Sequence, residues 1–124
     1  MSIVKLEDVR NHPKTQIYLE RADKYMEAIG YTEHGIRHAE ISAKRAKELL
    51  LQLQFGAKEA EMAAISSFLH DIGNMVGRVN HGLSGAMLAK EILDELKMET
   101  RDVATIMGAI GNHEEEVGDP ADTV

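Results

Sequence analysis

The stretch that decides the fold runs from Met62 to Leu69 and reads MAAISSFL. Drawn as a helix, it is apolar nearly all round, and such a helix belongs inside a domain with other helices covering it. The composition agrees, because 44% of the residues are hydrophobic while only 4% are aromatic. Ala, Leu, Ile and Met must therefore fill the core, which favours packed helices over a sheet. We predict an all-α fold of five to six helices, with a helix over residues 58–70 at its centre.

The other helices are predicted from capping residues and apolar periodicity. Pro13 suits the first turn of one helix and Gly30 its end, while Thr32 and Thr100 can each cap a further one. On the helix after Gly82, we expect the large apolar residues on one side, opposite a charged side, and these are Leu83, Met87, Ile92, Leu93 and Leu96. The expected spans are residues 13–29, 32–53, 83–96 and 101–112.

The end of the chain carries one more helix signal. Asp119-Pro120 is typical of a helix start, with Asp as the cap and Pro in the first turn. Four residues follow Pro120, so either a sixth helix is cut short or a polar tail contains the pair. We expect a single domain over residues 1–124 that lacks its C-terminal helix or helices.

Charge and composition exclude several classes of protein. The net charge of −7 opposes binding to a phosphate backbone, so we expect no nucleic-acid partner. No stretch approaches the roughly 20 apolar residues of a membrane span, and the N-terminus does not resemble a signal peptide. We therefore expect a cytoplasmic protein without a membrane partner. The chain has no Cys, so any metal must be bound by nitrogen and oxygen.

Histidines mark the candidate site. His70-Asp71 stands where the apolar helix ends, and a carboxylate placed there needs a partner such as a metal. Taken alone, each histidine fits a surface or capping residue. Five of the six, however, either share one face of an expected helix or lie at an expected helix end. Imidazole and carboxylate together suit Fe, Mn, Co, Ni or Zn. The candidate metal ligands are His34, His38, His70, Asp71, His81 and His113.

The segment Phe68-Leu-His-Asp-Ile-Gly73 is similar to the Leu-His-Asp-Ile-Gly hallmark of the HD superfamily of metal-dependent phosphohydrolases. The resemblance covers residues 32–116 and implies an HD-domain-like bundle. It implies His38, which lies 32 residues before His70, as the upstream ligand. His34 is the competing match, or an additional ligand one turn earlier. His81 and His113 resemble the later histidines of the subgroups that bind two metals.

This resemblance also implies a chemistry. Asp71 would bind one divalent metal ion or bridge two, and the metal would activate water for attack on phosphorus. Arg78 would contact the phosphate. The implied function is hydrolysis of a phosphate ester or phosphoanhydride of a small molecule, a nucleotide above all. Two departures favour the alternative, a non-catalytic HD module for signalling or for ligand or metal binding. Asn74 replaces the family's usual Lys, and Asp119 and Asp122 come too early for its last ligand. The sequence does not decide whether the chain forms a homo-oligomer.

Overall fold

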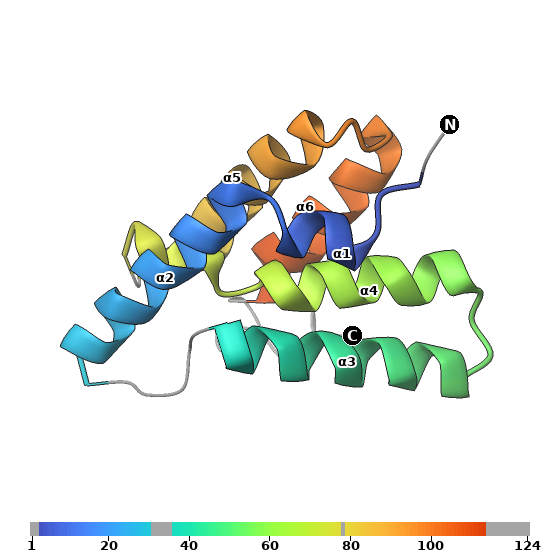
Figure 1. Ribbon diagram of the computed structural model, residues 1–124, viewed down its shortest axis with the longest axis horizontal. Helices are drawn as coiled ribbons and strands as arrows, with labels where there is room; N and C mark the ends of the chain where they lie inside the picture. Colours follow the sequence, from blue (N-terminus) through green and yellow to red (C-terminus); the bar gives the residue numbers. More distant parts are fainter. Residues whose placement is uncertain (1–2, 31–35, 78, 114–124) are drawn as a thin grey trace.

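The computed structural model describes residues 3–30, 36–77 and 79–113, with His113 described by its backbone alone. This part of the chain is helical throughout and contains no strand, so the all-α prediction is confirmed (Figure 1). The elements are α1 (Leu6–Arg10), α2 (Pro13–Ala28), α3 (Ile36–Gln52), α4 (Ala57–Leu69), the short 3-10 helix η1 (Ile72–Met75), α5 (His81–Glu95) and α6 (Thr100–His113).

Helix α4 lies at the centre, as its apolar sequence predicts. It runs antiparallel beside α3 (Figure 1) and also packs against α6 and α1. Its buried side chains include Ile65, Phe68 and Leu69, each at most 1% exposed. Because its last turn is surrounded by other helices, the residues that follow Leu69 begin inside the domain.

Helix α5 packs through small residues in its first half and through the large residues Ile92 and Leu93 near its end. Gly82, Gly85, Ala86 and Ala89 are buried, and α5 contacts both η1 and α6. The expectation is confirmed for Ile92 and Leu93, which are buried, but it is wrong for Leu83 and Met87 in the first half of the helix, since they are 63% and 55% exposed. The physical reason is the close approach of the neighbouring elements, which leaves no room for a large side chain on that face.

Backbone contact between η1 and α5 explains this approach. A Cβ added to Gly73 would lie 1.8 Å from the carbonyl oxygen of His81 and 2.5 Å from the amide nitrogen of Gly85. A Cβ on Gly85 would in turn lie 3.2 Å from the nitrogen of Gly73. The two backbones can cross this closely only because both positions are glycine. It holds the turn after His70-Asp71 directly against the first turn of α5.

Polar side chains attach α2 to α5 on the surface. Lys14 binds both Glu91, at 3.0 Å, and Glu95, while the Tyr18 hydroxyl donates to Glu91 at 2.8 Å. Hydrogen bonds to Glu95 and then Glu91 raise the pKa of Lys14. The Tyr18 hydroxyl, followed by Lys14, lowers the pKa of Glu91. These contacts position α2 over η1, which it also contacts.

Helix boundaries agree with the expected spans to within a few residues where they can be compared. Gly30 has the positive φ, 95°, of a residue that ends a helix. The predicted starts at Thr32 and at Asp119-Pro120 lie outside the described residues. In the described ranges, no helix combines the length and apolar character needed to cross a membrane.

Candidate metal centre

Four of the predicted site residues come from three elements that meet at the end of α4. His38 lies in the first turn of α3, and His81 is the first residue of α5. His70 follows the last residue of α4, and Asp71 precedes η1. Residues far apart in the sequence are therefore brought together by the α3–α4 hairpin and by the crossing of η1 with α5.

The Asp71 carboxylate is at the centre of this group. Its Oδ2 lies 3.1 Å from Nε2 of His70 and 3.9 Å from Nε2 of His38. Its other oxygen, Oδ1, lies 3.7 Å from Nε2 of His81. One potential ligand atom from each of His38, His70 and Asp71 falls within 4.8 Å of the others. Both carboxylate oxygens thus face imidazole nitrogen, two histidines on one side and one on the other.

The ring of His70 is oriented by the backbone. Its Nδ1 lies 2.6 Å from the carbonyl oxygen of Ser67. A carbonyl can only accept, so Nδ1 carries the proton, and in the neutral ring Nε2 presents its lone pair. That lone pair faces the Asp71 carboxylate at 3.1 Å. Two acceptors at this distance require a positive centre shared between them, either a second proton on the ring or a metal ion.

Exposure increases across the site from α5 to α3. The side chains of His81 and Asp71 are 8% and 13% exposed, while those of His70 and His38 are 27% and 38% exposed. The rings of His38 and His70 are tilted by 55°, with their centroids 5.7 Å apart. The group is therefore embedded on the η1–α5 side and reachable from solvent on the α3 side.

Three predicted site residues are not placed by the structure. His34 and Arg78 lie outside the described residues, as does the side chain of His113, although α6 ends at His113. Asn74, which stands where the family has Lys, is fully buried in η1. The buried Asn74 side chain therefore supplies no positive charge to the open part of the site.

A pocket beside His70 was not predicted from the sequence. It has a volume of about 340 Å³ and is lined by Ser42, Ser66, Ser67, His70 and Ala109. The only sequence signal is the presence of serines within otherwise apolar helical stretches. Their convergence depends on how α3, α4 and α6 pack, which the sequence pattern does not specify.

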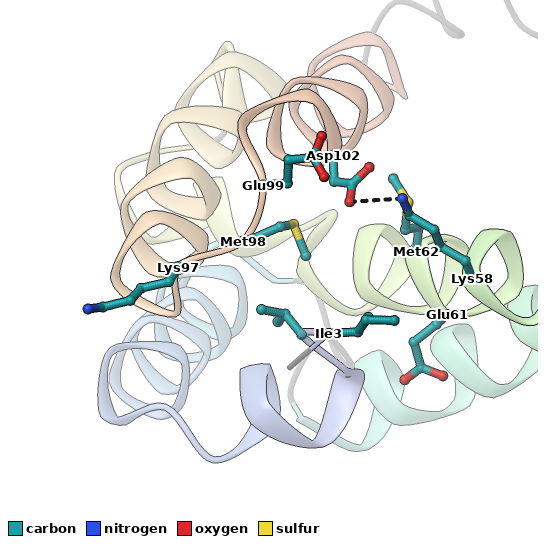
Figure 2. Close-up of a pocket in the computed structure, with 9 residues that line it drawn as sticks. Ile3, Lys58, Glu61, Met62, Lys97, Met98, Glu99 and Asp102 are labelled. Carbon is teal, nitrogen blue, oxygen red and sulfur yellow. Dashed lines mark ion pairs between the residues drawn. The ribbon is translucent and has the colours of Figure 1, made fainter. Parts of the chain in front are cut away.

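Two further hollows lie away from the histidines. One, of about 140 Å³, is bounded by Ile3, Met62 and Met98, with the Lys58–Asp102 ion pair at 3.3 Å beside it (Figure 2). The other is an open groove of about 670 Å³ between α5 and α6, lined in part by Leu83 and Met87. Neither includes any of the four clustered site residues.

The chain matches no protein-family model, no curated protein and no solved structure. The likeness to the HD superfamily therefore remains a resemblance of sequence motifs. The cluster around Asp71 is a separate observation, made from the geometry of the folded chain.

Proposed function

We propose that this chain is a metal-dependent phosphohydrolase whose centre is formed by His38, His70, Asp71 and His81. The observation that supports the proposal is the Asp71 carboxylate, with imidazole nitrogens 3.1 to 3.9 Å from its two oxygens. Together with these histidines, the Asp71 carboxylate would hold one or two metal ions. By the family resemblance, the reaction is hydrolysis of a phosphate ester or phosphoanhydride, with a nucleotide as the expected substrate.

The donor set fits a transition metal. It offers imidazole and carboxylate without thiolate, the combination that suits Fe, Mn, Co, Ni or Zn. The contact from Nδ1 of His70 to the Ser67 carbonyl, at 2.6 Å, is the kind of outer interaction that orients metal-binding histidines. A metal bound here would act as a Lewis acid and lower the pKa of bound water towards about 7.

The residues themselves perform three tasks. Asp71 and His81 hold the embedded side of the centre, because both are nearly buried. The Ser67 carbonyl fixes which nitrogen of His70 faces the site. His38, on the open side, leaves the centre accessible to a phosphate group and to water. A local positive charge is required for such a substrate to bind, since the chain as a whole carries a charge of −7.

A second candidate function is a non-catalytic module that binds a metal or a ligand. One observation favours it: Asn74 is fully buried where the resembling family has a lysine. A cation that would contact phosphate is thus missing from η1. The two candidates differ in turnover and not in metal binding, so both quantities must be measured.

The decisive experiment substitutes Asp71. Asp71→Ala removes both carboxylate oxygens, so metal content and phosphatase activity should fall together, by roughly 100-fold or more, because even outer contacts are worth 10- to 100-fold. Asp94→Ala, the same change on the exposed face of α5, is the matched control and should retain both. Metal content is measured by elemental analysis, and hydrolysis with Mn²⁺ against phenyl phosphate and a panel of nucleotides.

Three results would change this assignment. Metal binding without turnover of any ester would favour the non-catalytic module. Activity that survives Asp71→Ala would refute the proposed centre. A wild-type chain that binds no transition metal would exclude the phosphohydrolase and a metal-binding module, and would leave only a module that binds another ligand.

A further inference from the structure

The pocket next to His70 adjoins the group around Asp71, because His70 belongs to both. Its walls come from three helices: Ser42 in α3, Ser66 and Ser67 in α4, and Ala109 in α6. The pocket has a volume of about 340 Å³ and is open to solvent, so it could contact part of a small molecule without enclosing it. We refer to it as the serine pocket.

The three serine hydroxyls are available to a ligand. All three residues are partly buried, and within the described part of the chain none of their hydroxyls forms a hydrogen bond to another residue. A helical serine commonly bonds to the carbonyl four residues earlier, so three uncommitted hydroxyls around one pocket are unusual. Each can donate one hydrogen bond and accept two.

The chemistry of the serine pocket selects a neutral group. Among the described residues that line it there is neither Lys nor Arg. A second phosphate placed there would need charge-assisted donors, and the chain as a whole is acidic, with a net charge of −7. A group rich in hydroxyls needs none of this, because serine hydroxyls both donate to it and accept from it.

We infer that the serine pocket binds the sugar of a phosphate monoester whose phosphate lies at the Asp71 centre. The substrate class is then a sugar phosphate or a nucleoside monophosphate, and not a polyphosphate. This inference rests on the proposed function and specifies its substrate. In the reaction, the oxygen of water bonds to phosphorus, the bond between phosphorus and the ester oxygen breaks, and the sugar leaves as an alcohol with a proton from the water. The products are inorganic phosphate and the free sugar or nucleoside.

The test compares kcat/KM for ribose 5-phosphate, phenyl phosphate and ADP, using the full chain loaded with Mn²⁺. Phenyl phosphate presents no hydroxyl to the serine pocket, and ADP presents a second phosphate. Ser42→Ala and Ser66→Ala should each lower the ratio of ribose 5-phosphate to phenyl phosphate by about 3- to 10-fold, the value of one neutral hydrogen bond. Ser84→Ala, in α5 and outside the pocket, should leave that ratio unchanged.

Folding is not expected to confuse this result, because alanine is a better helix former than serine, and Ser42→Thr should recover part of the ratio by restoring a hydroxyl. Hydrolysis of phenyl phosphate with equal ratios in the wild type and in both serine variants would overturn the inference and leave the proposed function standing. Preferential hydrolysis of ADP would do the same. Failure of the metal-loaded chain to hydrolyse any of the three compounds would refute the proposed function and this inference with it.

Discussion

Substitution of Gly73 by alanine should separate η1 from α5. The new methyl carbon would lie 1.8 Å from the carbonyl oxygen of His81 and 2.5 Å from the nitrogen of Gly85. A normal contact between carbon and oxygen is about 3.3 Å or more, so the two backbones must move apart by roughly 1.5 Å. No flexible side chain can yield instead, because the atoms in contact belong to the backbone.

The energetic cost can be bounded from the same geometry. Overpacking in a closely packed interior costs about 1–3 kcal/mol and sometimes more. Since two backbone atoms are too close to the added methyl group, we expect about 3 kcal/mol or more from Gly73→Ala. This is a large part of the roughly 5–15 kcal/mol that stabilises a typical domain. The movement would also shift His81 away from Asp71, so affinity for Mn²⁺ should fall as well.

A matched control is available in α6. Gly108 has no atom within 4 Å of the position where its Cβ would lie, so Gly108→Ala should be neutral or stabilise the helix by up to about 1 kcal/mol. Urea unfolding at 25 °C, followed by circular dichroism, measures both free energies of unfolding. A free energy of unfolding for Gly73→Ala within about 1 kcal/mol of the wild-type value would refute the close backbone contact between η1 and α5.

Two further predictions concern the core and the response to acid. Phe68 is 1% exposed, so Phe68→Ala should lower the free energy of unfolding in urea by about 3–5 kcal/mol. Phe55 is 51% exposed, so Phe55→Ala should lower it by less than about 1 kcal/mol. Equal losses would place Phe68 outside the core. Burial alone would raise the pKa of Glu61, but bonds from the Leu6 N–H at 2.7 Å and Lys47 at 3.0 Å outweigh it and lower that pKa. The ionised Glu61 carboxylate therefore stabilises the fold fully at pH values above the ordinary glutamate pKa of about 4.3. This stability is lost as the pH falls through the lowered pKa. Glu61→Gln should flatten this acid limb of the stability curve measured by urea unfolding, and an unchanged limb would contradict the assignment.

The helices that the sequence predicts well are those specified by local signals. Pro13 and Gly30 mark the ends of α2, and the apolar run before His70 identifies α4 as the central helix. Helix α1 was not predicted, because it has five residues and its contacts are with distant ones. The Leu6 N–H donates to Glu61, and Arg10 binds Glu40 at 2.6 and 2.8 Å. Contacts between residues 30 or 55 positions apart leave no periodic signal.

Hydrophobicity identifies the buried face of α5 only near the end of the helix, where Ile92 and Leu93 are buried. Large apolar residues such as Leu83 are the usual indicators of a buried face, yet here Gly85 and Ala89 are buried and Leu83 is exposed. The reason is the backbone crossing at Gly73, which excludes large side chains. Similarly, the motif around His70 indicated the group at Asp71, while the serine pocket appeared only when three helices were in place.

The crossing of the two glycines also restricts how the centre can move. If α5 slid by one residue along η1, Ser84 or Ala86 would replace Gly85 against Gly73, and its Cβ would meet the η1 backbone. Shear between these two elements is therefore blocked, and the separation of Asp71 and His81 is fixed. Adjustment to a substrate is then left to the His38 side chain, which at 38% is the most exposed of the four clustered residues. A substrate would be accommodated on that side of the centre, against an η1–α5 base whose two elements cannot slide past each other.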